Sequence, residues 1–201
     1  MDLTTPLLDV APAVRGALLQ ALTRLEAPVT RRQLANLARV APGHASSVLQ
    51  DLIELGIVDE TTAGRASLVS LNRDHLATHA VLELANLRST FIARLRERVS
   101  MIPGLCEAWL FGSVARGDAG RASDIDLLLV LDDLDSADVH DHLTRLHTDV
   151  RSWTGNHLQV LEHTPSSWRR LVRSENPLVA EIHTHGIPLT ATVTAPRRPR
   201  R

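Results

Sequence analysis

The stretch LFGSVARGDAGRASDIDLLLVL, residues 110–131, places a glycine-punctuated turn and two aspartates directly before a run of apolar residues. Alternate side chains of a strand point to the same face, so Asp124 and Asp126 project together while Ile125 points away. Two unpaired carboxylates on one face repel each other, and burying either of them is costly. A divalent cation, most often Mg²⁺, resolves this repulsion by coordinating oxygens from both side chains.

The turn that precedes the aspartates predicts a phosphate site. Gly112 lets the backbone approach a ligand closely. Ser113 opens a short helical turn whose free N–H groups can hold phosphate oxygens, and Arg116 can reach the same phosphates. A phosphate cradle beside a metal-binding pair indicates chemistry on a nucleoside triphosphate, in which metal ions orient the α-phosphate. Each feature alone is common in proteins without this chemistry, but their order here favours a nucleotide site.

The segment GSVARGDAGRASDIDLLLV resembles the signature of the minimal nucleotidyltransferases of the polymerase-β superfamily, and the resemblance covers about residues 100–190. It implies an α/β domain with a small mixed sheet. It also implies binding of a nucleoside triphosphate with Mg²⁺ or Mn²⁺ and transfer of a nucleotidyl group to an acceptor hydroxyl. The residues implied for nucleotide binding are Gly112, Ser113, Arg116 and Ser123. Those implied for metal binding and catalysis are Asp124 and Asp126.

The family carries a third carboxylate on a later strand, where it helps to activate the acceptor hydroxyl as a base. The matching segment here is HLQVLEH, residues 157–163, and the equivalent position is Gln159. A glutamine cannot take a proton and is a poor ligand for Mg²⁺. Glu162 lies three residues further on, so it points to the opposite face of a regular strand. Two functions therefore stay open: a nucleotidyltransferase, or a regulator whose catalytically impaired nucleotidyltransferase domain serves as a nucleotide sensor.

The first 75 residues show the pattern of a winged helix-turn-helix domain. Apolar residues at helical spacing predict three helices, and two alternating stretches predict a β-hairpin as the wing. These elements are expected at 12–26, 30–37, 45–55, 57–61 and 65–71. The following segment SLVSLNRDHLA is similar to the one that joins a MarR- or ArsR-like winged helix to a nucleotidyltransferase domain in bacterial two-domain proteins.

In a winged helix, the second helix of the turn motif enters the major groove and the wing contacts the DNA backbone or minor groove. Candidate contacts to bases are His44, Ser46, Ser47 and Gln50. Candidate contacts to phosphates are Arg31, Arg32 and Arg65. Residues 1–78 contain seven arginines against eight acidic residues, so DNA binding would need local basic patches and a homodimer. Winged helices also dock proteins, and that alternative stays open.

Residues 75–99 predict one long connecting helix, after which strands and helices alternate. Strands are expected at 105–111, 124–131 and 155–163, with a short edge strand at 187–190. We therefore predict an α+β chain, a winged helix-turn-helix followed by a polymerase-β-like nucleotidyltransferase domain. Its predicted parts are a winged helix over 1–75, a connecting helix over 76–100, the nucleotidyltransferase domain over 101–190 and a disordered basic tail over 191–201.

Composition fits an ordered protein, with 44% hydrophobic and 22% charged residues. The chain has no lysine, which is typical of a GC-rich bacterial genome and also compatible with selection for bidentate phosphate contacts. The single cysteine, Cys106, excludes an internal disulfide, suits a reducing cytoplasm and is expected in the core. No signal peptide or membrane-spanning run is visible, so we expect a cytoplasmic protein without a membrane partner. A toxin–antitoxin role is compatible with either function, and genomic neighbours would show it.

Overall fold

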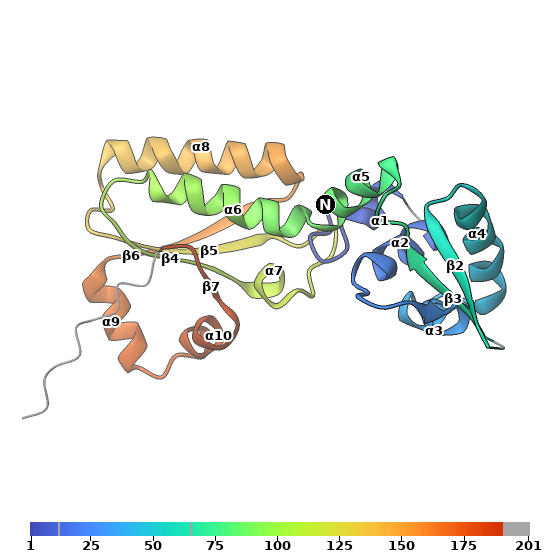
Figure 1. Ribbon diagram of the computed structural model, residues 1–201. Coiled ribbons are helices and arrows are strands. Elements are labelled where there is room, and N and C mark those ends of the chain that lie inside the picture. The colour runs from blue at the N-terminus through green and yellow to red at the C-terminus, as the bar shows by residue number, and fades with distance from the viewer. Residues whose placement is uncertain (12, 65, 191–201) are drawn as a thin grey trace, which may run out of the picture. The chain divides into compact units, whose positions relative to one another are not determined.

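The structure is a computed structural model, and it describes residues 1–11, 13–64 and 66–190. The chain divides into two compact units, one made of Asp2–Ser89 and the other of Met1 with the residues from Thr90 onward. Both units combine helices with a small sheet (Figure 1), so the predicted α+β class is confirmed. The predicted tail over 191–201 lies outside the described residues.

The first unit contains the helices α1 (Leu7–Val10), α2 (Ala13–Thr23), α3 (Arg31–Leu37), α4 (Pro42–Glu54) and α5 (Leu76–Ala85). Helix α3 begins where the sequence predicts, because Thr30 accepts a hydrogen bond from the Gln33 N–H while the Gln33 side chain accepts from the Thr30 N–H. Helix α4 begins three residues earlier than expected. Proline is favoured at the first helical position, and Pro42 occupies it.

The sheet of this unit has the order β1-β3-β2 and is antiparallel throughout. The predicted hairpin corresponds to β2 (Val58–Ala63) and β3 (Ala66–Leu71), while the two-residue strand β1 (Val29–Thr30) was not expected. Leucines from the helices pack against the sheet and form one buried cluster, which includes Leu18, Leu22, Leu34, Leu49 and Leu52. The amphipathic spacing of the sequence therefore accounts for the core of this unit.

The long helix expected over 75–99 is interrupted. Helix α5 ends at Ala85, Asn86 leaves the helical conformation with φ −95° and ψ 7°, and α6 (Leu87–Ser100) follows. Asparagine is neutral to unfavourable inside helices and favoured at their ends, because its side chain competes for backbone hydrogen bonds. The apolar periodicity continues across this break, which explains why the sequence predicts a single helix.

The second unit is built on a four-stranded mixed sheet with the order β6-β5-β4-β7. Its strands are β4 (Leu105–Phe111), β5 (Ile125–Leu131), β6 (Leu158–His163) and β7 (Ile187–Pro188). Strand β5 runs antiparallel to β4 and parallel to β6, and the short β7 pairs antiparallel with β4. The predicted small mixed sheet and its edge strand are therefore both present.

Helices cover both faces of this sheet. Figure 1 shows α6 and α8 (Ala137–Thr154) on one face, and α9 (Pro165–Arg173) with α10 (Pro177–His185) on the other. All seven residues of β5 except Asp126 are buried, as expected for a central strand covered on both sides. The apolar run therefore fixes β5 in the middle of the unit, and the two aspartates lie at its amino-terminal end.

Cys106 is exposed, so its prediction as a core residue is wrong. The register between β4 and β5 shifts between Leu105 and Glu107, which leaves Cys106 at an irregularity of the ladder. A bulged residue does not follow the alternation of the strand. Among the described residues, no helix is long and apolar enough to cross a membrane.

Candidate functional site

The two aspartates lie where β5 begins. Asp124 directly precedes the strand and Asp126 is its second residue, and both are half-buried. In the ladder, Asp126 pairs with Phe111 on β4 and with Gln159 on β6. The site is thus bounded by the end of β4 on one side and the start of β6 on the other.

Gly112 brings the turn after β4 into contact with the Asp126 carboxylate. It adopts φ +69° and begins the short helix α7 (Gly112–Arg116). A Cβ at this position would lie 2.0 Å from Asp126 Oδ2 and 2.9 Å from its Cγ. Glycine is strongly favoured here, since the left-handed conformation strains other residues and a Cβ would displace the Asp126 carboxylate. The predicted neighbourhood of turn and carboxylate therefore exists in the structure.

The site has an excess of negative charge. Burial raises the pKa of Asp126, the charges of Asp124 and Glu181 raise it further, and Arg116 opposes them. A half-buried carboxylate beside like charges favours protonation or a bound cation. The electrostatics of Asp126 therefore fit a cation held between the two aspartates.

Gln159 lies beside the aspartates, and its Nε2 donates a hydrogen bond of 2.6 Å to Asp124 Oδ2. Glu162 is exposed and pairs with Leu129, so it belongs to the opposite face of β6. No group of three or more His, Cys, Asp or Glu side chains that could hold a metal ion occurs within 1–11, 13–64 and 66–190. The starts of β5 and β6 thus offer two carboxylates and an amide.

Arg116, expected to bind phosphates, is already paired with two carboxylates. Its Nε donates to Asp118 Oδ2 at 3.1 Å, and its Nη1 donates to Glu181 Oε1 on α10. These hydrogen bonds, the one with Asp118 foremost, raise the pKa of Arg116. A triphosphate would have to compete with both carboxylates for this guanidinium.

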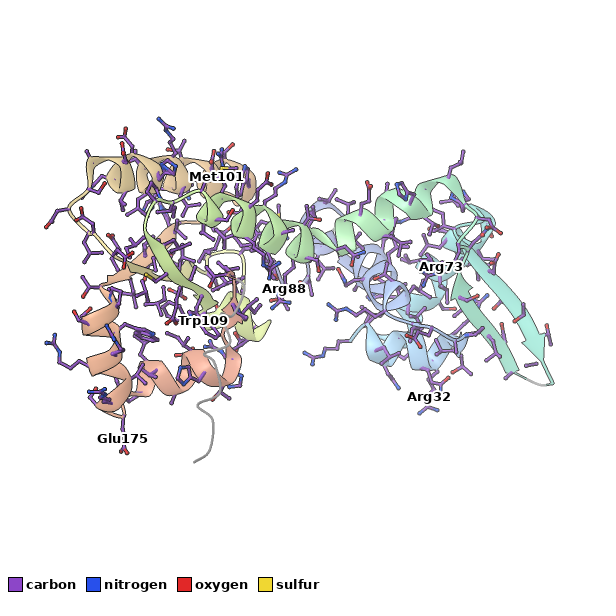
Figure 2. All side chains as sticks on the ribbon, turned by 60° about the vertical axis from the view of Figure 1, so that its left-hand side comes forward. Arg32, Arg73, Arg88, Met101, Trp109 and Glu175 are labelled. Atoms are coloured by element: carbon purple, nitrogen blue, oxygen red, sulfur yellow. The ribbon has the colours of Figure 1, made fainter. Side chains whose placement is uncertain are left out.

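Glu181 is the residue at this site that the sequence did not reveal. Helix α10 is held over the sheet by Val179 and Ile182, which are buried with Phe111 and Trp168. Trp109, labelled in Figure 2, is partly buried, packs on the same cluster and has its ring centroid 6.4 Å from that of His183 on α10. Glu181 lies far from the aspartates in sequence, and no local pattern marks it.

The two serines of the expected nucleotide site have structural partners. The Ser113 carbonyl accepts hydrogen bonds from the N–H groups of Gly117 and Asp118, which closes α7. The Ser123 hydroxyl accepts from the Gly120 N–H at 2.9 Å and closes the turn before Asp124. Ser123 therefore shapes the loop that carries the first aspartate.

In the first unit, two expected DNA contacts are engaged within the protein. Arg31 forms an ion pair with Glu60 on β2, with its Nε 2.7 Å from Oε1, and its Nη2 donates to Gln50 Oε1 at 3.1 Å. The hydrogen bonds from Arg31 and Ser67 lower the pKa of Glu60 to about 2. The positive charge of Arg31 is thus balanced by Glu60, and the Gln50 side-chain oxygen already accepts a hydrogen bond from Arg31.

The other expected DNA contacts lie on the surface. Figure 2 shows Arg32 on the outer side of α3, where it is exposed. Three residues of the first turns of α4 are also exposed: His44, Ser46 and Ser47. Arg65 lies outside the described residues.

The solved structures that resemble part of the chain include two toxin–antitoxin crystal structures. One is a toxin–antitoxin crystal structure with AMP-PNP, with 21% identity and a TM-score of 0.33, covering 54% of this chain and 74% of that one. The other is a mutant of the toxin–antitoxin pair MntA-HpeT, with 21% identity and a TM-score of 0.34, covering 53% of this chain and 74% of that one. Likenesses of this degree do not establish shared architecture or function. No curated protein matches the chain.

The sequence itself gives a more specific match. Residues 90–164 match the family model for the nucleotidyltransferase domain. The matched segment contains Gly112, both aspartates and Gln159, and it lies wholly within the second unit. The candidate site therefore lies within a segment that is similar to the nucleotidyltransferase domain.

Proposed function

We propose that the second unit transfers a nucleoside monophosphate from a nucleoside triphosphate to an acceptor hydroxyl, with Mg²⁺ or Mn²⁺ as cofactor. The observation that carries this proposal is the contact between Gly112 and the Asp126 carboxylate at the start of β5. It joins the phosphate-binding turn to the metal-binding pair within the matched domain. The assigned groups are Gly112, Ser113, Arg116 and Ser123 for the nucleotide, and Asp124 and Asp126 for the metal.

The donor set supports a divalent cation. Asp124 and Asp126 supply carboxylate oxygens, which Mg²⁺ and Mn²⁺ prefer. The raised pKa of Asp126 reflects burial near Asp124, and a bound cation would offset that cost. When bound, the cation would neutralise charge on the phosphates and favour attack at the α-phosphorus.

In the proposed reaction the acceptor oxygen forms a bond to the α-phosphorus. The bond from this phosphorus to the oxygen that bridges to the β-phosphate breaks, and pyrophosphate leaves with the electron pair. The hydroxyl proton passes to water, because Gln159 has no basic group. Its amide instead holds the Asp124 carboxylate through the 2.6 Å hydrogen bond. Arg116 would replace its hydrogen bond to Glu181 by one to a phosphate oxygen, since a triphosphate carries more negative charge than a carboxylate.

The test is label transfer from each of the four nucleoside triphosphates in a cell extract, with label in the α- or the γ-phosphate. We expect the α-label, and not the γ-label, to reach an acceptor in the presence of Mg²⁺. Asp124→Asn and Asp126→Asn should abolish transfer. Transfer of the γ-label, or no transfer with any nucleotide, would refute the proposal.

We further propose that the first unit is a winged helix that binds DNA, as a homodimer. The order of α2, α3 and α4 before the hairpin of β2 and β3 supports this assignment. Exposed Arg32 on α3, with the exposed polar residues of α4, provides contacts of the type that phosphates and base edges accept. The pair of Arg31 with Glu60 reduces the positive charge available to DNA.

A second candidate function is a DNA-binding regulator whose nucleotidyltransferase domain senses a nucleotide. The contact of Gln159 with Asp124 favours it, because an amide replaces the proton acceptor. Footprinting on the promoter of its own gene, with and without nucleoside triphosphate and Mg²⁺, separates the two functions. A regulator should change its footprint with nucleotide and show no label transfer, whereas absence of any footprint would refute this candidate.

A further inference from the structure

One buried polar side chain behind the candidate site has no role in the proposed chemistry. Asn156 is only 5% exposed and lies two residues before β6. Its Nδ2 donates to the Ser123 carbonyl at 2.8 Å and faces the Arg121 carbonyl at 3.4 Å. Both carbonyls belong to the loop that ends at Asp124. Asn156 is thus a link between the start of β6 and the residue adjacent to the first aspartate.

The position of Asn156 is itself fixed by the end of α8. Gly155 adopts φ +75°, and its N–H donates to the Arg151 carbonyl at 2.8 Å. The Asn156 N–H donates to Thr154 Oγ1 at 3.0 Å, and this hydroxyl donates to the Val150 carbonyl at 2.8 Å. The left-handed glycine turn therefore directs the asparagine towards the loop from a hydrogen-bonded helix end.

The segment around Asp124 is held on both sides. Asn156 binds the Ser123 carbonyl before it, and the His157 carbonyl accepts from the Ile125 N–H after it at 2.8 Å. Between these two backbone contacts, Gln159 binds the Asp124 carboxylate. The Ser123 carbonyl accepts from the Asn156 amide in a partly buried place, and loss of this donor would leave the carbonyl without that hydrogen bond, which would be costly.

We infer that Asn156 is a positioning residue, which holds the Ser123–Asp124 peptide so that the Asp124 carboxylate stays beside that of Asp126. The inference rests on the proposed function for the role of the two carboxylates. Partners that orient metal ligands are needed for full metal affinity, although they do not touch the metal. Asn156→Asp keeps the size of the side chain but faces the two carbonyls with an acceptor, and Asn156→Ala removes both donors.

The first test is hydrogen exchange of the chain without nucleotide or metal. In Asn156→Asp and Asn156→Ala, the amides of Ser123 and Ile125 should exchange at least about tenfold faster than in the wild type. The control is Leu143→Ala, which removes a buried α8 side chain, 7% exposed, away from the loop. Loss of stability alone would accelerate exchange equally in this control, and such a result would overturn the inference.

The second test is Mn²⁺ binding in the presence of a non-hydrolysable nucleoside triphosphate. We expect affinity to fall by about 10–100-fold in both Asn156 variants and to be retained in Leu143→Ala. Unchanged affinity with accelerated exchange would overturn the positioning role. If the wild type binds no Mn²⁺, the proposed function fails, while the exchange data still decide whether Asn156 holds the loop.

If the Asn156 variants do not fold, hydrogen exchange of the wild type alone still tests the inference. The amide of Ile125 should be as protected as those inside β5, and far more than the amides of Asp133 and Leu134, which lie in the loop after β5. Protection of Ile125 as low as in that loop would refute the inference, since the segment would then not be held at all.

Discussion

Replacement of Gly112 by alanine tests the contact at the centre of the site, and Gly117→Ala provides a matched control. Both glycines lie in α7 or at its end, with φ +69° and φ +80°. A Cβ at Gly117 would meet nothing within 4 Å, whereas one at Gly112 would lie 2.0 Å from Asp126 Oδ2. The two variants therefore share backbone strain and differ in the steric overlap with a carboxylate.

The expected magnitudes follow from these contacts. A left-handed alanine costs about 1–2 kcal/mol, which applies to both variants. In Gly112→Ala, the Asp126 side chain must also leave its rotamer, which adds about 0.5–1.5 kcal/mol. A loss of 1 kcal/mol lowers Tm by about 4–8 °C in a unit of this size. Gly112→Ala should therefore have the lower Tm, and it alone should lose Mn²⁺–nucleotide binding.

Tryptophan fluorescence is the suitable assay of stability. All three tryptophans, Trp109, Trp153 and Trp168, belong to the second unit, so the signal reports its unfolding selectively. Calorimetry at a temperature well below Tm would measure binding of Mn²⁺ with a non-hydrolysable nucleotide. Equal Tm values for the two variants, or retained binding in Gly112→Ala, would refute the contact between the turn and Asp126.

Three further perturbations have defined outcomes. Gln159→Asp adds a carboxylate beside Asp124 and Asp126, so Tm should fall without Mg²⁺ and recover when Mg²⁺ is added. Label transfer should increase. A Tm that does not depend on Mg²⁺ would contradict this prediction. Glu60→Gln breaks the ion pair with Arg31. A surface ion pair of this kind stabilises the folded state by about 0.2–1 kcal/mol. Since the folded pKa of Glu60 is lowered from 4.5 to about 2, the stability difference from wild type should be full above pH 4.5 and vanish as the pH falls towards 2, measured by circular dichroism. Thr30→Ala removes the cap of α3 and should cost about 1 kcal/mol, while Thr30→Ser should retain most of it.

The sequence predicts those parts of the site that lie close together along the chain. Gly112 and the two aspartates belong to one stretch of strand, turn and strand, so alternation and turn chemistry suffice to bring them together. Gln159 could be placed as well, because β6 follows β5 in a regular parallel pairing. The apolar spacing of the helices likewise predicts most of the core.

The features that escaped prediction depend on contacts between distant residues. Glu181 reaches Arg116 only because α10 folds back over the sheet. The ion pair of Arg31 with Glu60 joins α3 to β2 and cannot be read from local charge counts. Asn156 lies in a tight turn after α8, where an asparagine is common for conformational reasons alone. Long-range packing, which leaves no periodic pattern, decides each of these cases.

Binding of Mn²⁺ with a non-hydrolysable nucleoside triphosphate, followed by electron paramagnetic resonance, tests the central claim most directly because it requires no acceptor. The matched control is Glu162→Gln, which removes an exposed carboxylate on the opposite face of β6. We predict that the wild type and this control bind Mn²⁺ with nucleotide, and that Asp124→Asn and Asp126→Asn do not. Equal binding by all four proteins, or no binding by the wild type, would contradict the assignment of the site.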